Sequence, residues 1–491
     1  MSIQQAFDVG LVGCGPVSAV LANLLGAYGA SVAIFEKERQ PYAFPRAVHF
    51  DGEVMRVLQS IGVADEFEGR LFVNLGMRFV SASEKLLIDW PRPQGKGAHG
   101  WCASYRFHQP DLEQLLRSAV VRFPQHRLQF AREVTALEDD GDAVGVKVRD
   151  VDTRSESKVR CRYVVGCDGA RSFVRDWMGS RLIDLQSDAQ WVVVDVLMRR
   201  SVPSLSDWTV QLCDPARPTT IARGAGNRRR WEFMVMPGDD LQALLKPASL
   251  WRLLSRWISS DDAEIERAAI YQFNAVIAQS WRKGRIFIAG DAAHRTPPFL
   301  GQGLCAGVRD AANLAWKLAY ALTGEGNERL LDSYESERAP HVREFILQAV
   351  RVGRILQSTS PDEVLQRDTR MSSKPETMHT PAPRLGIGLH RSDDPQGGRI
   401  FAQPIGPAGI RMDDVVGHRF VLVVDEVHMA ELTPVLAQSC KRAGAALFEA
   451  TREDLAPFDS VALLVRPDRY ILGSAREATQ VGPLLAQLEF S

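Results

Sequence analysis

The sequence has no excess of charge of either sign. Its 491 residues include 59 Lys and Arg against 60 Asp and Glu, which leaves a formal net charge of −1. Proteins that hold a nucleic-acid backbone or an anionic membrane surface usually carry a basic excess. We therefore expect no nucleic-acid partner. With 45% apolar and 24% charged residues, the chain has an ordinary globular composition, which argues against disorder.

Cysteine pairs with a metal-binding or redox spacing are also missing. The seven cysteines are scattered along the chain without a C-x-x-C pair, so neither a zinc site nor a disulfide framework is expected. A reducing cytoplasm suits such a chain best. A G-x-S-x-G elbow is absent as well, which argues against a serine hydrolase. We expect no bound metal.

One long hydrophobic run is present, but its composition does not suit a membrane span. Residues 9–35 carry no charge, and the run is long enough to cross a bilayer. It follows Asp8 without the basic flank of a signal peptide, and glycine and proline interrupt it. No membrane span is expected, because the order of residues within the run has another explanation.

The uncharged run has the pattern of a βαβ unit. Residues 7–12 are a β-prone apolar run, residues 16–28 are apolar at helical spacing, and residues 31–35 form a second strand. Pro16 suits the first position of the helix, and Gly29 suits the position just past its end. A parallel strand buried on both faces is an unbroken hydrophobic run, which explains the missing charges.

The turn of this unit resembles the dinucleotide fingerprint G-x-G-x-x-G, with serine at the third glycine. Gly13 allows the tight turn, Gly15 lets the backbone approach a pyrophosphate, and Pro16 opens a helix whose N-terminus attracts an anion. Glu36 ends the second strand, where an acidic residue accepts hydrogen bonds from ribose hydroxyls, and Lys37 follows as a further candidate contact. NAD or FAD is favoured over NADP. The alternative is a glycine turn that binds nothing.

Two further strands end in an acidic residue. Residues 163–166 are an apolar strand followed by Asp168, and residues 285–288 are another, followed by Gly290 and Asp291. A carboxylate at the C-terminal end of a parallel strand points into the crevice where ligands of such sheets bind. Three strand ends that are distant in sequence imply a ligand longer than an adenosine nucleotide, so FAD is favoured over NAD.

The three motifs, in this order and at these distances, are similar to those of the single-component (class A) flavoprotein aromatic hydroxylases. The similarity covers roughly residues 5–350, and residues 297–304 and 309–318 most resemble the phenol-type branch. That branch includes 3-(3-hydroxyphenyl)propionate hydroxylase-like enzymes. The resemblance implies a p-hydroxybenzoate hydroxylase-like fold that binds FAD.

The resemblance also implies roles for individual residues. It places Asp291, with Gly290 before it, at the ribityl chain, Pro298 beside the flavin ring in the catalytic site, and Asp168 at a motif linked to both FAD and the nicotinamide. The other implied flavin contacts are Arg46 and Ala47 in a mobile loop, Gln109, and the segment with Gly301, Gly303 and Leu304 under the pyrimidine edge.

The helix expected after this segment has a physical role of its own. Apolar residues recur on one face over residues 304–322, and the helix starts at Gly303. Its N-terminus would face the flavin N1 and C2 carbonyl, where negative charge collects on reduction, and a helix end favours an anion by about 0.3–2 kcal/mol. We expect this helix to make a flavin easier to reduce.

The fold class expected is α/β. The resemblance implies a Rossmann-like FAD-binding domain, an antiparallel substrate sheet and a thioredoxin-like C-terminal domain. The first part of the FAD-binding domain is expected at 1–180, with substrate strands inserted near 75–105, and its second part, with a long helix, at 281–357. The substrate sheet is expected at 181–280, a linker at 358–385 and the C-terminal domain at 386–491.

Aromatic and arginine side chains of the substrate unit are open to two interpretations. Trp191, Trp208, Trp231 and Phe233 either line the substrate pocket or belong to the core, which is the commoner role of large aromatics. The arginines at 228–230 either attract an acidic substrate or form a solvated turn, which we favour.

The resemblance implies a monooxygenase of aromatic catabolism. NADH or NADPH would reduce FAD, O₂ would give a flavin C4a-hydroperoxide, and one oxygen would pass to the ring of a substituted phenol or catechol. His49 is a candidate catalytic base, although a structural histidine is at least as well supported. The alternatives are an oxidase or dehydrogenase without oxygen insertion, and a hydroxylase of a polycyclic natural product. A small aromatic substrate is the expected partner, bound by a monomer or homodimer.

Overall fold

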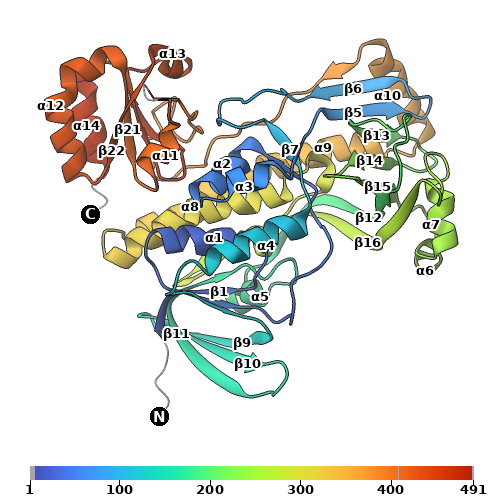
Figure 1. Cartoon of the computed structure of the whole chain (residues 1–491), viewed down its shortest axis with the longest axis horizontal. Helices are drawn as coiled ribbons and strands as arrows, with labels where there is room; N and C mark the ends of the chain where they lie inside the picture. Colours follow the sequence, from blue (N-terminus) through green and yellow to red (C-terminus); the bar gives the residue numbers. More distant parts are fainter. Residues whose placement is uncertain (1–5, 407–408, 489–491) are drawn as a thin grey trace.

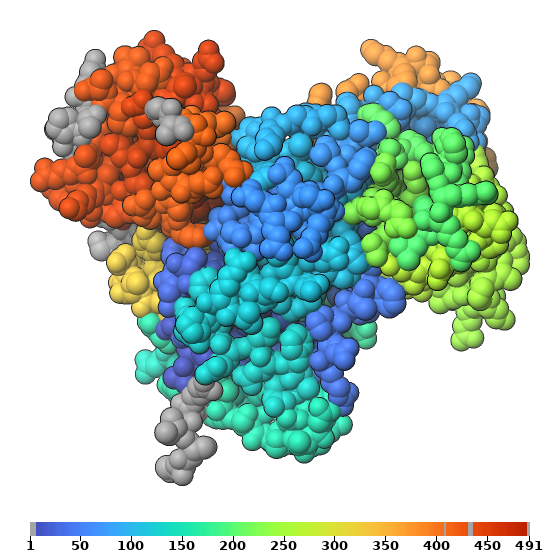
Figure 2. Space-filling model, viewed as in Figure 1, coloured from blue at the N-terminus to red at the C-terminus, as the bar shows by residue number. Residues whose placement is uncertain are grey.

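The computed structural model describes residues 6–406 and 409–488, so residues 1–5 and 489–491 of the predicted first and last units, and residues 407–408, lie outside the described residues. Three lobes are visible in Figures 1 and 2: a lower lobe with a parallel sheet, a lobe with a large mixed sheet on the right, and a C-terminal lobe at the upper left. Two long helices, α8 (Gly303–Thr323) and α9 (Glu328–Gln357), run between the lobes.

The lower lobe contains the predicted parallel sheet. β1 (Ala6–Val12) lies between β2 (Val32–Phe35) and β11 (Glu156–Gly166), and β18 (Ile286–Ile288) pairs with β11 in the same direction. The carboxyl ends of β1, β11 and β18 therefore meet at one edge of the sheet. The remaining strands are β8 (Arg127–Gln129) beyond β2, β17 (Arg282–Lys283) beyond β18, and the hairpin of β9 (Arg132–Asp139) and β10 (Val144–Asp150) against β11.

The predicted helix of the βαβ unit is α1 (Pro16–Ala27), and it packs between α4 (Gln109–Val120) and α8. The strands β1 and β2 are almost entirely buried, as the uncharged run predicted. The helix α8 begins at Gly303, the residue at which the sequence predicted its start. A short helix, α5 (Phe173–Met178), follows the end of β11.

The second lobe is built on a nine-stranded sheet. All neighbouring strands are antiparallel except the pairs β13–β5 and β20–β6, so the sheet expected to be antiparallel is mixed. In spatial order its strands are β19 (His294–Arg295), β16 (Ala263–Ala278), β12 (Leu182–Met198), β15 (Arg228–Met234), β14 (Thr219–Arg223), β13 (Thr209–Cys213), β5 (Gly76–Ser81), β6 (Leu86–Pro91) and β20 (Glu376–Thr377). The short helices α6 (Leu241–Leu244) and α7 (Pro247–Leu254) also belong to this lobe.

A small sheet lies between the two lobes. It pairs β3 (His49–Asp51) and β4 (Phe72–Val73) with β7 (Ser104–Arg106). The helices α2 (Gly52–Ser60) and α3 (Ala64–Glu68) follow β3 directly. This arrangement connects the parallel sheet to the nine-stranded sheet by several crossings of the chain.

The C-terminal lobe contains a four-stranded sheet. β21 (Val421–Asp425) is parallel to β22 (Ala446–Ala450) and antiparallel to β23 (Ala462–Val465), and β24 (Ile471–Ala475) completes the order β22-β21-β23-β24. The sequence pattern at 434–443 predicts a helix. In the structure this helix begins earlier, as α12 (Glu426–Arg442), because Asp425 caps it by accepting the N–H of His428. Shorter helices of this lobe are α11 (Met412–Val416), α13 (Arg452–Leu455) and α14 (Val481–Leu485).

Residues 358–385, expected as a linker, contain α10 (Pro361–Ser373) and the edge strand β20. Arg367 of α10 donates to the carbonyl oxygens of Ile355 and Cys213 at 3.0 and 2.9 Å. These bonds hold the helix, which the sequence did not predict because few of its residues are apolar.

Among the helices of residues 6–406 and 409–488, none combines the length and the apolarity needed to cross a membrane. The uncharged run at residues 9–35 folds as most of β1, the helix α1 and β2.

Candidate active site

The turn after β1 leaves the N-terminus of α1 open. Gly13 has a φ of +93°, and a Cβ there would lie 2.6 Å from the carbonyl oxygen of Cys167. Only glycine therefore allows the turn to pack this closely against the end of β11. A Cβ at Gly15, in contrast, would meet no atom within 4 Å. No side chain caps α1, and Pro16 is its first residue. Free amide groups beside open space are suited to bind a phosphate.

Glu36 lies just after β2, where an adenosine ribose was expected. One carboxylate oxygen accepts the backbone N–H of Cys14 at 2.8 Å, and the other accepts that of Glu38 at 2.9 Å. Lys37 is exposed. At the third glycine position, Ser18 is fully buried, and its hydroxyl has no hydrogen-bond partner among the described residues. The packing of α1 therefore accommodates the extra hydroxymethyl group without satisfying it.

Two carboxylates occupy the other strand ends of this edge. Asp168 follows β11; one of its oxygens accepts the N–H of Val174 at 3.1 Å, and the other is buried with no partner in the described part of the chain. Burial raises the pKa of the Asp168 carboxyl. Asp291 follows β18 and is exposed, although desolvation by the surrounding protein raises its pKa as well. Both carboxylates are available to a ligand.

The first turn of α8 is also open. Gly301 precedes it with a φ of +67°, and a Cβ there would lie 2.6 Å from Nδ1 of His49. No side chain caps the helix, and a Cβ at Gly303 would meet no atom within 4 Å. Pro298 and Leu304, on either side of this turn, are half-buried. The free amide groups of this turn are suited to bind a carbonyl or anionic edge of a ligand.

The loop before β3 is held from two sides. The side-chain oxygen of Gln109 accepts the N–H groups of Arg46 at 3.0 Å and Ala47 at 2.7 Å. From the nine-stranded sheet, the guanidinium of Arg230 donates to the carbonyl oxygens of Pro45 at 2.9 Å and Arg46 at 2.7 Å. Gln109, predicted as a flavin contact, therefore acts first on the backbone of the loop that was predicted to contact the flavin.

His49 is a buried link between the loop and the start of α8. Its Nδ1 lies 3.0 Å from the carbonyl oxygen of Gly301, and its Nε2 lies 2.7 Å from Oγ of Ser104. Because a carbonyl only accepts, Nδ1 carries the proton and Nε2 accepts the Ser104 hydroxyl. Burial, together with the nearby Arg106, lowers the pKa of His49 to about 3. A neutral imidazole with both nitrogens bonded is suited to position Gly301.

Acid should destabilise the protein through His49. A histidine in the unfolded chain titrates near pH 6.5, whereas the buried imidazole has a pKa of about 3. The stability that depends on neutral His49 is complete above pH 6.5 and is lost as the pH falls towards 3, by about 2 kcal/mol between pH 7 and 5. We expect His49→Asn, which keeps a donor for Gly301, to remove this part of the pH dependence of urea unfolding.

The matched control is His379→Asn, at an exposed position, which should keep the wild-type pH dependence. If the two variants lose equal stability between pH 7 and 5, His49 does not cause the acid sensitivity.

A buried ionic group supports the turn that carries Asp291. The carboxylate of Asp310, on α8, accepts the N–H of Gly290 at 3.0 Å, Nε2–H of His294 at 2.7 Å and Nε–H of Arg338 at 2.9 Å. Burial alone would raise the pKa of Asp310, but the charges of His294 and Arg338 lower it overall. Asp310 therefore fixes the end of β18 from the side of α8.

The nine-stranded sheet turns one face towards the loop before β3, and we call it the inner face. Arg230 and Glu232 of β15 lie on it, because alternate residues of a strand share a face and Arg230 binds the loop. Trp231 and Phe233 lie on the outer face, where their rings are 6.5 and 6.0 Å from that of Trp257. The core interpretation is therefore correct for Trp231 and Phe233.

Aromatic rings gather at one end of the inner face. The ring of Trp191 lies 6.0 Å from Phe273 and 5.7 Å from Phe299, which follows Pro298 directly. Trp191 is fully buried within this cluster. Trp208 lies away from it, under the guanidinium of Arg78 at 3.9 Å. Trp191 is thus the one of the four predicted aromatics that lies in a cluster with the Pro298 segment.

Each of the arginines at 228–230 is paired with a carboxylate. Arg228 pairs with Glu266 at 3.1 Å, Arg229 with Asp207 at 3.2 Å, and the buried Arg230 with Asp195 at 2.7 Å. The solvated turn that we favoured is wrong for Arg230, because its charge is used to hold the loop before β3. Attraction of an acidic substrate by this run is also weakened, since each charge is already paired.

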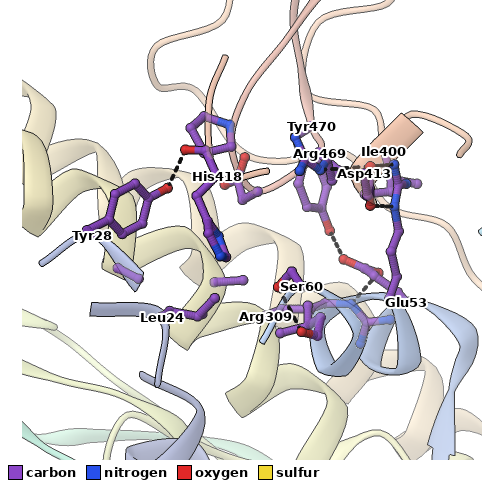
Figure 3. A pocket seen from close by; sticks show the side chains of 16 residues that line it. Leu24, Tyr28, Glu53, Ser60, Arg309, Ile400, Asp413, His418, Arg469 and Tyr470 are labelled. Atoms are coloured by element: carbon purple, nitrogen blue, oxygen red, sulfur yellow. Dashed lines mark hydrogen bonds and ion pairs between the residues drawn. The ribbon is translucent and has the colours of Figure 1, made fainter. Parts of the chain in front are cut away.

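A small cavity lies at the seam between α2, α8 and the C-terminal lobe (Figure 3). Its volume is about 40 Å³, enough for a few water molecules. On one wall Tyr28 donates to the carbonyl oxygen of His418 at 3.0 Å, and on the other Tyr470 donates to Glu53 at 2.9 Å. Glu53 in turn pairs with Arg309 of α8 at 2.6 Å. The cavity lies at the interface between the C-terminal lobe and the rest of the protein, and it is too small for a dinucleotide.

Comparison with known proteins decides the family. Residues 6–349 match the FAD binding domain family. The chain belongs to this family. The match agrees with the predicted extent of similarity and with the class A hydroxylase resemblance. A curated member, the "Probable NADH-specific resorcinol 4-hydroxylase" of Rhodococcus jostii (strain RHA1), is 33% identical over 99% of this chain and 95% of its own length.

Other family members are similar over most of the chain. The "3-(3-hydroxy-phenyl)propionate/3-hydroxycinnamic acid hydroxylase" of Burkholderia cenocepacia (strain HI2424) is 36% identical over 85% of this chain and 79% of its own length. Among solved structures, the flavin-dependent monooxygenase PieE in complex with FAD and substrate has a TM-score of 0.84 at 21% identity, with 98% of each chain covered. Aklavinone-11 hydroxylase with FAD and aklavinone has a TM-score of 0.81 at 21% identity, with 100% of each chain covered. These structures establish the fold.

Sequence reasoning missed several charged residues of the site. Asp310 was missed because the helix that contains it was recognised only by its apolar face. Arg106 and Glu232 were missed because they belong to no motif. The alternation of charged Arg230 and Glu232 with aromatic Trp231 and Phe233 was a usable signal, because it predicts opposite faces of one strand.

Proposed function

We propose that the protein is an FAD-dependent monooxygenase that hydroxylates the ring of a substituted phenol or catechol with NADH or NADPH and O₂, in the catabolism of aromatic compounds. The observation that carries this proposal is the convergence of three strand ends, each with a group that is open to a ligand, at one sheet edge. These groups are the open N-terminus at Gly15, the unpaired oxygen of Asp168 and the exposed carboxylate of Asp291. Membership of the FAD binding domain family supports the same ligand.

The residues around this edge suit the successive parts of FAD. Open helix N-termini suit the pyrophosphate and the pyrimidine edge, and carboxylates suit hydroxyl groups. The proposed contacts are Glu36 and Lys37 at the adenosine; Gly13, Gly15 and Pro16 at the pyrophosphate; Asp168, Gly290 and Asp291 at the ribityl side; and Arg46, Ala47, Gln109, Pro298, Gly301, Gly303 and Leu304 around the ring.

FAD, when bound, supplies electron transfer from the nicotinamide and the activation of O₂. The chain supplies position and charge. The N-terminus of α8 stabilises negative charge on the adjacent ring edge, and Gln109 and Arg230 hold the loop before β3 in place. We assign His49 to positioning the Gly301 carbonyl, because both its ring nitrogens are bonded within the protein. The hydrogen-bonded imidazole thus suits this role better than the predicted role of a base.

The names of the relatives narrow the substrate class. Resorcinol carries a second hydroxyl meta to the first, and 3-(3-hydroxyphenyl)propionate carries a side chain in the same position. We propose a meta-substituted phenol as the substrate and NADH as the reductant, since the resorcinol hydroxylase that matches 99% of the chain is named NADH-specific.

The finer divisions of the chain are also proposals. The order β22-β21-β23-β24, with one parallel and two antiparallel pairs, supports a thioredoxin-like C-terminal domain at 386–491. The other predicted units are kept as 1–180 with strands near 75–105, 181–280 and 281–357, with 358–385 as a connection that includes α10. All seven cysteines are free, which supports a cytoplasmic protein. A monomer or homodimer is the proposed state.

A substrate panel tests the proposed function. The purified protein, reconstituted with FAD, should oxidise NADH faster when resorcinol or 3-(3-hydroxyphenyl)propionate is added, and the product should gain one oxygen by mass. NADPH in place of NADH checks the reductant. Peroxide equal to all the NADH consumed would instead favour an oxidase, and turnover of polycyclic phenols alone would favour a natural-product hydroxylase.

A further inference from the structure

Glu232 is a buried carboxylate without a hydrogen bond. The residue is 7% exposed, and it forms a loose ion pair with Arg230, 3.9 Å away on the same strand. No residue of the described ranges donates a hydrogen bond to its carboxylate. Burial raises the pKa of Glu232, as does Asp195, more than Arg230 and Arg106 lower it. Neither carboxylate oxygen is among the fully enclosed side-chain atoms that lack a partner, so the carboxylate is open to a ligand on the inner face.

Arg106 is a buried cation without a carboxylate partner. It is 5% exposed, and its guanidinium donates to the hydroxyl of Thr209. Within the described part of the chain, no Asp or Glu forms an ion pair with it. Burial, with the neighbouring Arg92, lowers the pKa of Arg106 to about 10, so it stays charged near neutral pH. Buried arginines are rare without an anionic partner, which again points to a ligand.

Both groups lie beside segments that are proposed to contact the flavin. Glu232 lies on the inner face, two residues from Arg230, which holds the loop before β3. Arg106 is paired across β7 and β3 with His49, whose imidazole binds the carbonyl of Gly301. Each charge acts on the pKa of the other, but no ion pair joins them.

The neighbours of Glu232 do not satisfy it. Val193, opposite it on β12, is apolar. Thr220, opposite it on β14, donates its hydroxyl to the side-chain oxygen of Gln211 at 2.6 Å. Further along the inner face, the half-buried ring of Phe273, which stacks on Trp191, provides an aromatic surface. A phenol against this ring would bring a polar group towards Glu232.

We propose that Glu232 and Arg106 bind the reacting hydroxyl of the phenol, with Glu232 as the base that takes its proton. This inference rests on the proposed function and names a catalytic residue for it. The O–H bond of the substrate breaks, an O–H bond forms on the Glu232 carboxylate, and the electron pair stays on the phenolate oxygen. Arg106 donates to that oxygen and stabilises its charge. A phenolate ring is a stronger nucleophile towards the transferred oxygen than a neutral phenol ring.

The first test is Glu232→Gln in the FAD-loaded enzyme, measured with NADH and resorcinol. We expect kcat for hydroxylation to fall about 10²–10⁴-fold, the usual contribution of a general base. In the wild type the rate of hydroxylation should rise with pH as Glu232 ionises, with Arg230, Asp195 and Arg106 as the charged groups around it. This rise should be absent from the pH–rate profile of Glu232→Gln. The matched control is Glu264→Gln, at an exposed position of β16, which should behave as the wild type.

The second test is Arg106→Met, measured by equilibrium binding. Its Kd for resorcinol should rise about 10-fold, as for the loss of a charged hydrogen bond, whereas its Kd for 1,3-dimethoxybenzene should not change. Arg106→Lys should restore part of the resorcinol affinity.

Two results would overturn the inference. One is a Glu232→Gln enzyme with wild-type kcat and pH profile. If Glu232→Gln fails to bind FAD, wild-type resorcinol affinity in Arg106→Met overturns it instead. A wild-type enzyme that hydroxylates no phenol contradicts the proposed function itself, so the two failures are distinguishable.

Discussion

Gly15→Val should abolish FAD binding without unfolding the protein. The backbone at Gly15 has φ −78° and ψ −178°, an extended conformation open to any residue, and a Cβ there would meet no atom within 4 Å. The added side chain should therefore cost little stability. It would fill the space in front of the N-terminus of α1, where the pyrophosphate is proposed to lie. We expect the FAD affinity to fall at least about 100-fold, the equivalent of about 2.7 kcal/mol.

Flavin fluorescence titration measures this affinity, and circular dichroism melting reports the fold. The matched control is Gly69→Val, since Gly69 is exposed, has φ −65° and also has no atom within 4 Å of an added Cβ. Gly69→Val should bind FAD as the wild type does. A yellow Gly15→Val protein with unchanged FAD affinity would place the dinucleotide elsewhere.

Arg466→Met should lower the free energy of unfolding by about 3–5 kcal/mol, the usual cost of breaking a buried ion pair from one side. Arg466 is fully buried and donates to both oxygens of Glu337, at 2.8 and 2.9 Å, and to Asp468 at 2.9 Å. Lys317 of α8 completes the group at 2.6 Å from Glu337. Because two cations balance two carboxylates, removal of Arg466 leaves one buried negative charge unpaired.

Urea unfolding followed by tryptophan fluorescence measures this loss, since the ring of Trp316 lies 5.2 Å from the Arg466 guanidinium. Adding Asp468→Asn should recover part of the stability, because it removes the unpaired charge. The control is Arg476→Met, whose pair with Asp459 is exposed and should contribute little. Equal losses for Arg466→Met and Arg476→Met would show that the buried group does not hold the C-terminal lobe.

The parts of the fold predicted best were those with strong local signals. Pro16 at the first helical position marked the start of α1, and the apolar face that begins at Leu304 marked the start of α8 at Gly303. The start of α12 was missed, although its cap Asp425 was a local signal. The helix α10 was missed, although Pro361 opens it and acidic residues occupy its first turn. Its packing depends on Arg367, which donates to carbonyl groups that are distant in the sequence.

The candidate site was predictable to the extent that it lies at strand ends. Parallel strands bring their carboxyl ends to one edge, so the motifs at Gly13, Asp168 and Asp291 by themselves implied a shared ligand. The roles of His49 and Gln109 were not predictable in this way. Their partners, Gly301 and the loop before β3, are brought to them only by tertiary packing.

The sequence by itself therefore determined the family, the dinucleotide and the edge of the sheet where it is proposed to bind, because these depend on short motifs and on the direction of strands. Only the tertiary structure decided which charges remain unsatisfied. Arg230 and Glu232 are two residues apart on one strand, yet the first is neutralised by Asp195 and the second has no hydrogen bond. That difference depends on which side chains the neighbouring strands bring to each carboxylate or guanidinium, and no local pattern encodes it.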